Sequence, residues 1–464
     1  MKSLRCTLGV VTGFCLVCLV SPGLRAQNQN PSSTAGTTAE LTQRLEDLQK
    51  QIDRPQAELA SARLQLKGFS EPAGAAASVP VPGAAEAAAS PVVSKAESAP
   101  PASSPGLMKT LLGSTSLSGF VDGYYGYNFE HPRVNAPSVL LGNPGTGLSG
   151  LRAFDSPYNQ FSLNAVELIL DKPPDANTNR IGYHVAVGFG NAMNVVGSTE
   201  PGGLGYAQYL KEAYGSYLAP VGKGLQIDFG KFVTQHGAEV IESKDNWNYS
   251  RGILFTYAIP FYHFGLRTKY VFNDKYQFSA YLVNGWNNIV DNNTGKTVGL
   301  QFGWNPNKKI AVIQNYMVGP EEASNNSTVR QLWDTVVTYS PTGKLSFILN
   351  YDYGRGDRMA VLANPVWWTG GAGYVRYQFS NNYALATRYE YYNDHFGFTT
   401  GTGQHINEFT GTFERKIHGS FITRLEYRRD IASRPSLYKG TTPVNYQDTL
   451  AAGLIYTFDT REAQ

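Results

Sequence analysis

The chain has 464 residues, of which 16% are charged, against roughly 25% in ordinary soluble proteins. Its formal net charge of +3 is too small to indicate nucleic-acid binding, and no block of lysine and arginine is interleaved with aromatic residues. The 29 tyrosines, 23 phenylalanines and 48 glycines favour a β-rich fold over a helical one.

The first segment has the features of a secretory signal peptide. Lys2 and Arg5 precede an apolar run over residues 8–20, which is shorter than the roughly 20 residues that a spanning helix needs. We expect cleavage near Ala26, which makes residues 1–26 the signal peptide, and a lipid anchor is the less favoured alternative. The mature chain then has neither disulfides nor cysteine-ligated metals, because all its cysteines lie in this segment: Cys6, Cys15 and Cys18.

A short heptad pattern lies in residues 27–70. Its apolar positions keep a 4-3-4 spacing: Leu41, Leu45, Leu48, Ile52, Leu59, Ala62 and Leu66. Pro55 interrupts the pattern, and because a proline inside a helix costs about 3 kcal/mol it kinks or divides this one. A periplasmic coiled coil that joins subunits or contacts the cell wall and a marginal helix in a mobile tail are both consistent with the pattern. Residues 71–106, rich in Ala, Pro, Ser and Val, are predicted to be a disordered linker.

Residues 107–464 form the main domain, in which apolar residues alternate with a period of two. This pattern predicts an all-β domain of about sixteen strands. The predicted strands are residues 117–129, 159–171, 180–190, 208–219, 224–232, 262–272, 275–286, 297–304, 309–319, 329–339, 344–354, 368–379, 383–392, 406–417, 420–430 and 446–458.

The connections between these strands alternate in length. Short turns such as NDK, NPNK, SPTG and SNN are separated by long segments, among them VTQHGAEVIESKDNWNYSRG and PEEASNNST. Outer-membrane barrels have short periplasmic turns and longer outer loops, whereas a soluble sandwich gives no reason for such alternation. No other window holds about 18 apolar residues, so the chain enters a membrane only as a closed antiparallel β-barrel.

The two faces of each strand differ in polarity. In the segment LATRYEYY, Leu385, Tyr389 and Tyr391 share one face, while Arg388 and Glu390 share the other. An arginine facing lipid at mid-membrane costs roughly 2–4 kcal/mol, so we expect the charged face to line a wet lumen. The charged wall positions of this kind are Arg267, Lys269, Arg376, Arg388, Glu390, Arg424, Glu426 and Arg428. Aromatic residues near strand ends, including Tyr124, Tyr392, Trp304 and Trp368, are expected at headgroup level.

Three stretches resemble the OmpL-like family of outer-membrane β-barrel porins. They are SLSGFVDGYYGYNFEHP, LKEAYGSYLAPVGKGLQIDFGKFVTQHGAEVIES and PFYHFGLRTKYVFNDKYQFSAYLVNGWNN, within a likeness that covers residues 115–460. The resemblance implies a diffusion channel in the bacterial outer membrane, and barrels of this size often form homotrimers. It also implies that the third outer loop, residues 233–260, folds into the channel and narrows it.

That loop supplies the remaining candidate residues for the constriction: Glu239, Glu242, Lys244, Asp245 and Arg251. If the loop folds inward, its acidic residues face the wall arginines and create a transverse field, and rings of charge of this kind set ion selectivity. An ordinary surface loop with solvated charges is the alternative.

No catalytic, metal or cofactor site is predicted. The histidines show no metal-ligand spacing, and neither a nucleophile elbow nor a phosphate-binding loop is present. The favoured function is passive diffusion of small hydrophilic solutes or ions through a porin in the outer membrane. The alternative is a structural protein that tethers the membrane to peptidoglycan through residues 27–70.

Overall fold

A computed structural model describes residues 113, 115–133, 149–203, 205–356 and 365–461. The expected signal peptide, heptad segment and linker lie outside these residues. Among the described residues, none of the helices is long and apolar enough to cross a bilayer.

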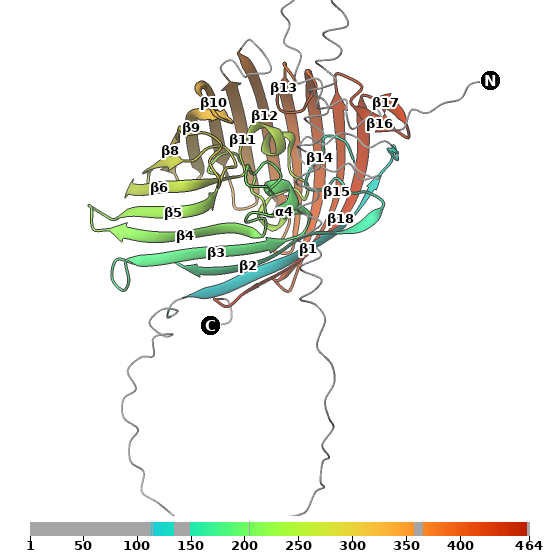
Figure 1. The fold of residues 1–464 in the computed structure, drawn as a ribbon. Helices are drawn as coiled ribbons and strands as arrows, with labels where there is room; N and C mark the ends of the chain where they lie inside the picture. The colour runs from blue at the N-terminus through green and yellow to red at the C-terminus, as the bar shows by residue number, and fades with distance from the viewer. Residues whose placement is uncertain (1–112, 114, 134–148, 204, 357–364, 462–464) are drawn as a thin grey trace, which may run out of the picture. The chain divides into compact units, whose positions relative to one another are not determined.

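In the described part of the chain, sixteen antiparallel strands form a closed barrel, which confirms the predicted fold class (Figure 1). Each strand pairs with its neighbours in sequence, and β18 closes the ring by pairing with both β15 and β1. The barrel strands are β1 (Ser116–Asn128), β2 (Gln160–Lys172), β3 (Ile181–Phe189), β4 (Leu210–Ala219), β5 (Leu225–Val233), β6 (Tyr262–Asn273), β7 (Tyr276–Val283), β8 (Thr297–Asn307), β9 (Ile310–Glu322), β10 (Asn325–Tyr339), β11 (Leu345–Gly356), β12 (Val366–Gln378), β13 (Tyr383–Asp394), β14 (Gln404–Ile417), β15 (Phe421–Ala432) and β18 (Tyr446–Asp459).

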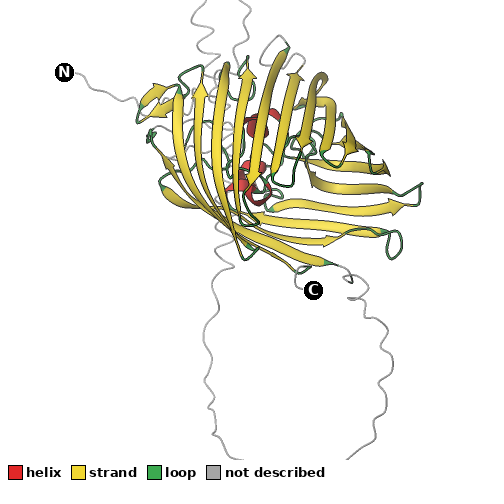
Figure 2. Cartoon of the chain, turned by 180° about the vertical axis from the view of Figure 1, so that it is seen from behind, coloured by secondary structure: helices red, strands yellow, loops and turns green. Residues whose placement is uncertain are grey.

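The connections contain a few short elements. Helix α4 (Asn191–Val196) follows β3, and a two-stranded hairpin of β16 (Leu437–Lys439) and β17 (Thr442–Val444) lies between β15 and β18. Between β5 and β6 are a 3-10 helix, η2 (Ser243–Asp245), and a π-helix, η3 (Leu254–Ala258). Figure 2 shows the helical segments within the ring of strands.

The prediction of a long loop at residues 320–328 is wrong. Strand β9 continues to Glu322 and β10 begins at Asn325, so Ala323 and Ser324 alone connect them. The neighbouring connection stabilises this extension, because Asn293 Nδ2 donates to the carbonyls of Pro320 and Glu322 at 3.1 and 3.3 Å. Turn composition alone did not indicate that a neighbouring loop would supply these contacts.

The predicted lipid-facing residues lie on the outer face of the barrel. On β13, Leu385 and Tyr389 are 41% and 54% exposed, whereas Arg388 and Glu390 on the opposite face are buried. The same division holds on the neighbouring strands, where Leu425, Phe409 and Tyr377 are exposed. The predicted alternation is therefore confirmed, with apolar side chains placed toward the bilayer.

Three of the aromatic residues expected at headgroup level lie inside instead. Tyr124, Tyr392 and Trp368 are buried, whereas Trp304 is exposed on the outer face. Their strand-end position was correct, but each occupies a lumen-facing position and packs against loops that enter the barrel. Trp368, for example, donates its Nε1–H to the carbonyl of Ala258 at 3.0 Å.

Candidate functional site

The connection between β5 and β6 lies against the inner wall of the barrel, and we refer to residues 233–260 as the inner loop. Residues 248–259 of this loop are all buried. The contacts of the whole inner loop reach three parts of the wall, formed by β13–β15, by β1 and β4, and by β9–β11.

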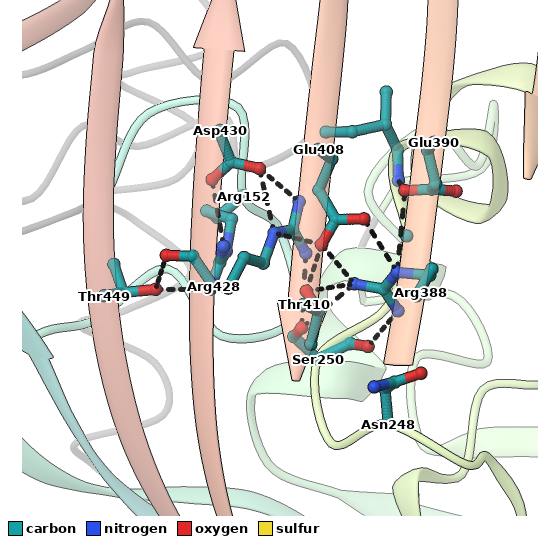
Figure 3. Close-up of polar contacts among 12 residues, drawn as sticks. Arg152, Asn248, Ser250, Arg388, Glu390, Glu408, Thr410, Arg428, Asp430 and Thr449 are labelled. Carbon is teal, nitrogen blue, oxygen red and sulfur yellow. Dashed lines mark hydrogen bonds and ion pairs between the residues drawn. The ribbon is translucent and has the colours of Figure 1, made fainter. Parts of the chain in front are cut away.

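Arg388 of β13 forms the central contact between the wall and the inner loop (Figure 3). Its Nη1 atom donates to Glu239 Oε1 at 2.6 Å and to the carbonyl of Ser250 at 2.7 Å. On the wall side, its Nε atom donates to Glu408 Oε2 at 3.0 Å. The side chain is completely buried, so the carboxylates and carbonyl around it replace the water that the guanidinium would otherwise bind.

Glu390 and Glu426 accept hydrogen bonds from the backbone of the inner loop. Glu390 Oε2 accepts from the N–H of Ile253 at 2.6 Å, just before the π-helix begins. Glu426 accepts from the N–H groups of Tyr249 and Ser250 at 2.5 and 2.9 Å. Buried backbone donors need such partners, and the wall supplies them because the loop is too irregular to pair with itself.

Glycine at position 252 allows this close approach. A Cβ atom at this position would overlap the carboxylate of Glu390. The N–H of Gly252 also donates to Glu239 Oε2 at 2.6 Å, so the same turn contacts two carboxylates. A larger residue would push the loop away from β13.

Two further arginines of β15 bind backbone carbonyls of the loop. Arg424 donates from Nη1 to the carbonyl of Ser243 at 2.5 Å and from Nη2 to that of Asn246 at 2.7 Å. Arg428 Nη1 donates to the carbonyl of Arg251 at 2.7 Å. Both guanidiniums are also paired with wall carboxylates, which neutralises their charge in the buried interface.

The second part of the wall holds the loop from β1 and β4. Lys211 on β4 forms ion pairs with Glu242 of the loop and with Glu167 of the wall, the latter at 2.6 Å. Tyr249 donates its hydroxyl to Asp122 Oδ1 on β1 at 2.8 Å. Burial, together with this carboxylate, raises the pKa of the Tyr249 hydroxyl well above its usual range, so it remains a donor.

The third part of the wall holds the start of the loop. Asn315 of β9 donates to the carbonyl of Gln235 at 3.1 Å, and the N–H of Ala238 donates to Asn350 Oδ1 of β11 at 3.1 Å. The same two asparagines donate to the carboxylate of Asp334 at 2.6 and 2.8 Å. His236 is buried between these contacts, and burial lowers the pKa of its imidazole well below its usual range.

The expectation that the charged wall faces open water is wrong for five of its residues. Arg388, Glu390, Arg424, Glu426 and Arg428 are buried beneath the inner loop. The sequence shows that these residues face inward, but it does not show that another part of the chain covers them. Their ion pairs and hydrogen bonds to the loop compensate the cost of removing the charges from water.

The other predicted residues divide into two groups. Glu239 and Arg251 are buried, and Arg251 donates to the carbonyls of Ile241 and Tyr249 within the loop. Glu242 is largely covered by its ion pair with Lys211. Charges that keep contact with water are on Lys244, Asp245, Arg267, Lys269 and Arg376.

Several residues of the site were missed by the sequence analysis. Asp122, Asn315, Asn350 and Glu408 all contact the loop or the buried arginines. They occupy inward positions of their strands, so a complete list of polar inward positions would have included them. Their spacing along the chain carried no sign of a shared site, because the barrel brings together strands far apart in sequence.

Metal-ligating groups do not gather in this site. Within the described ranges, no group of three or more His, Cys, Asp or Glu side chains is arranged to hold a metal ion. The polar groups of the site contact one another and the loop backbone, so their hydrogen bonds and ion pairs hold the loop in position.

The comparison with known protein families agrees with this architecture. Residues 114–458 match a family described as “Putative beta-barrel porin-2, OmpL-like”. No curated protein sequence matches the chain.

Solved structures similar to the chain include a porin, an outer membrane channel and an outer membrane protein. The anion-selective porin from Comamonas acidovorans is 10% identical with a TM-score of 0.48, over 74% of this chain and 99% of that chain. The outer membrane channel DcaP of Acinetobacter baumannii is 12% identical with a TM-score of 0.48, over 74% and 97%. OmpT of Vibrio cholerae is 12% identical with a TM-score of 0.47, again over 74% and 97%. At these identities the likeness concerns the fold alone.

Proposed function

Because the chain belongs to the OmpL-like family of outer-membrane β-barrel porins, we propose that it passes small hydrophilic solutes or ions by passive diffusion, with the inner loop setting the width of its channel. The observation that carries the proposal is the attachment of the loop to three parts of the inner wall. A loop fixed in this way keeps a constant position in the lumen, which a size limit for solutes requires.

The charged residues of the site have two different roles in this proposal. The buried set, centred on Arg388 and Glu239, positions the loop and does not contact the solute. The set that retains contact with water has four cations, Lys244, Arg267, Lys269 and Arg376. Ion pairs join Lys244 to Asp245, Arg267 to Asp228 and Arg376 to Glu414, so Lys269 has the least compensated charge of the four within the described residues. Charges lining a pore select ions of opposite sign, so we propose a modest preference for anions.

Measurements in a planar lipid bilayer test the channel and its selectivity separately. The purified protein is expected to give discrete conductance steps. In a salt gradient, the sign of its reversal potential is expected to indicate selectivity for anions. Replacing Lys269 and Arg376 together by glutamine should move that potential toward cation selectivity. Arg429→Gln is the matched control, because Arg429 lies on the outer face and pairs there with Asp448 at 3.2 Å.

The two parts of the proposal fail in different ways. Absence of conductance steps from folded protein contradicts the channel itself. Conductance with an unchanged reversal potential in the double variant contradicts only the role of the exposed cations.

A second function is favoured by the heptad pattern of residues 41–66. In this proposal the N-terminal segment joins the barrel to peptidoglycan, or joins three copies of the chain into a homotrimer. Deleting residues 27–106 separates the alternatives. If the segment is a tether, the deletion weakens the cell envelope. If it is a trimer contact, the deletion lowers the native mass of the protein. If the barrel acts as a channel alone, its conductance is unchanged.

A further inference from the structure

A cavity with a volume of about 280 Å³ lies beside the inner loop, among the connections that follow β3, β7 and β13. Its lining includes Trp286, Glu321, Arg330, Trp368 and Phe398. None of these residues belongs to the contacts that hold Arg388 or Glu239. Long connections mark the outer end of a barrel of this class, so the cavity lies on the side where solutes enter.

Aromatic rings form one wall of the cavity. Trp286 and Trp368 meet edge to face at 6.1 Å between ring centroids, and Phe398 stacks on Trp368 at 5.4 Å. Trp368 is fixed by its hydrogen bond to Ala258. The rings therefore offer a preformed apolar surface against which the C–H groups of a ligand can pack.

Arg330 supplies a donor that lacks an acceptor. Its guanidinium lies 5.0 Å from the ring centroid of Trp286 and 5.2 Å from that of Phe398. Although its Nε atom is buried, no hydrogen-bond partner for it exists among the described residues. Leaving a buried charged donor unsatisfied costs about 1–3 kcal/mol or more. The Nε–H itself is out of reach of a ligand, but Arg330 as a whole is half-buried and lines the cavity, so we assign the contact with a ligand oxygen to its terminal nitrogens.

Glu321 provides acceptors next to this donor. Its Oε2 atom accepts from the N–H of Trp286 at 2.7 Å, and its Oε1 atom accepts from the hydroxyl of Thr297 at 2.6 Å. A carboxylate has about four lone-pair sites, so it can accept further hydroxyl donors. Its negative charge balances that of Arg330, and a balanced site favours a neutral ligand over an ion.

We propose that this cavity binds a neutral, hexose-sized sugar. A sugar ring has C–H groups on its face for the aromatic wall, and hydroxyls that can accept from Arg330 and donate to Glu321. The volume lies just below the roughly 300 Å³ at which sites for drug-sized ligands begin, so one ring fits. The site would concentrate sugar at the outer mouth of the channel, and this use of the site rests on the proposed diffusion function.

Calorimetric titration of the full-length protein in detergent tests the site without requiring conduction. D-glucose, D-galactose and D-mannose are the probes, with D-glucuronate and benzoate as charged alternatives. We expect saturable binding of at least one hexose. Arg330→Met, which keeps the side chain between the rings but removes its donors, should weaken that binding by about tenfold or more.

Two further variants complete the experiment. Phe398→Leu removes an aromatic wall from a connecting segment and should also weaken hexose binding. Trp333→Phe is the control, because Trp333 lies on the same strand as Arg330 but is 46% exposed on the outer face. Heat-dependent migration in gels verifies that each variant is folded.

The outcomes are distinct. Absence of hexose binding, equal binding by the wild type and Arg330→Met, or binding of the charged probes alone would each overturn the sugar site. Hexose binding without conductance would support the sugar site and contradict the proposed diffusion function.

Discussion

Arg388 on β13 and Glu239 in the inner loop, 149 positions apart in the chain, form a buried ion pair at 2.6 Å. The pair joins the barrel wall to the segment that crosses its lumen. Because both charges are almost entirely removed from water, each depends on the other and on the polar groups around them. Removal of one partner therefore affects the position of the loop more than it affects the charge of the channel.

Replacing Arg388 by methionine should release the inner loop. The change leaves the buried carboxylate of Glu239 without its ion-pair partner and Glu408 with Arg428 alone, and breaking a buried pair in this way costs about 3–5 kcal/mol. We expect a lower apparent melting temperature, noisier single-channel currents and faster proteolysis within residues 233–260. Arg429→Met is the control, since this outer-face arginine forms a partly exposed pair with Asp448. Equal effects of the two changes would contradict the special role of Arg388.

Acid should weaken the attachment of the loop at His236. Burial lowers the pKa of this histidine in the folded state, so the folded protein favours its neutral form. The stability that this provides is fully present above the unfolded pKa of about 6.5 and is lost as the pH falls below it. Apparent melting temperatures measured between about pH 8 and pH 5 should decline less steeply in His236→Gln than in the wild type.

His418→Gln serves as the control for that series. His418 lies exposed in the turn between β14 and β15, away from the inner loop. Its replacement should leave the slope of melting temperature against pH unchanged. A His236→Gln profile that overlays the wild type would show that other groups govern the acid response.

Replacing Asp352 by asparagine should stabilise the barrel. Asp352 is fully buried opposite Asp334 in the β10–β11 pairing, and neither of its carboxylate oxygens has a hydrogen-bond partner among the described residues. An asparagine places a permanent N–H donor against the carboxylate of Asp334, whereas Asp352 can donate there only after it has taken up a proton, a gain of about 1–3 kcal/mol. The measurement is the temperature at which heat-dependent gel migration changes.

Asp122→Asn is the matched comparison for this prediction. Asp122 is equally buried but accepts from Asn164, Ser243 and Tyr249. Its replacement places an N–H group against existing donors and should lower the transition temperature. The same direction of change in both variants would contradict this account.

A methyl group at position 354 should disturb the cavity beside the inner loop, which Trp368 lines. Gly354 packs against the buried indole of Trp368, and a Cβ atom there would overlap the ring. Overpacking of this kind costs typically about 1–3 kcal/mol. We expect Gly354→Ala to lower the melting temperature and shift tryptophan fluorescence. Gly411→Ala, where a Cβ atom meets nothing within 4 Å, should leave both unchanged.

The barrel and the direction of its side chains could be predicted from the sequence alone. All sixteen strands were predicted within a few residues of their observed ends, and Leu385 and Arg388 were assigned to the correct faces. These features are local, because a strand alternates its side chains every residue and turns have recognisable compositions. The extension of β9 and β10 was missed because its stabilising contacts come from Asn293 in another connection.

Which of the inward charges contact water depends instead on how distant segments of the chain pack together. Arg388 and Lys269 are indistinguishable in the sequence, since each is a basic residue on the inner face of a strand. The folded chain covers Arg388 with the inner loop and leaves Lys269 exposed. Burial depends on contacts between segments more than a hundred residues apart, and a period-two pattern records only the side of the sheet on which a residue lies.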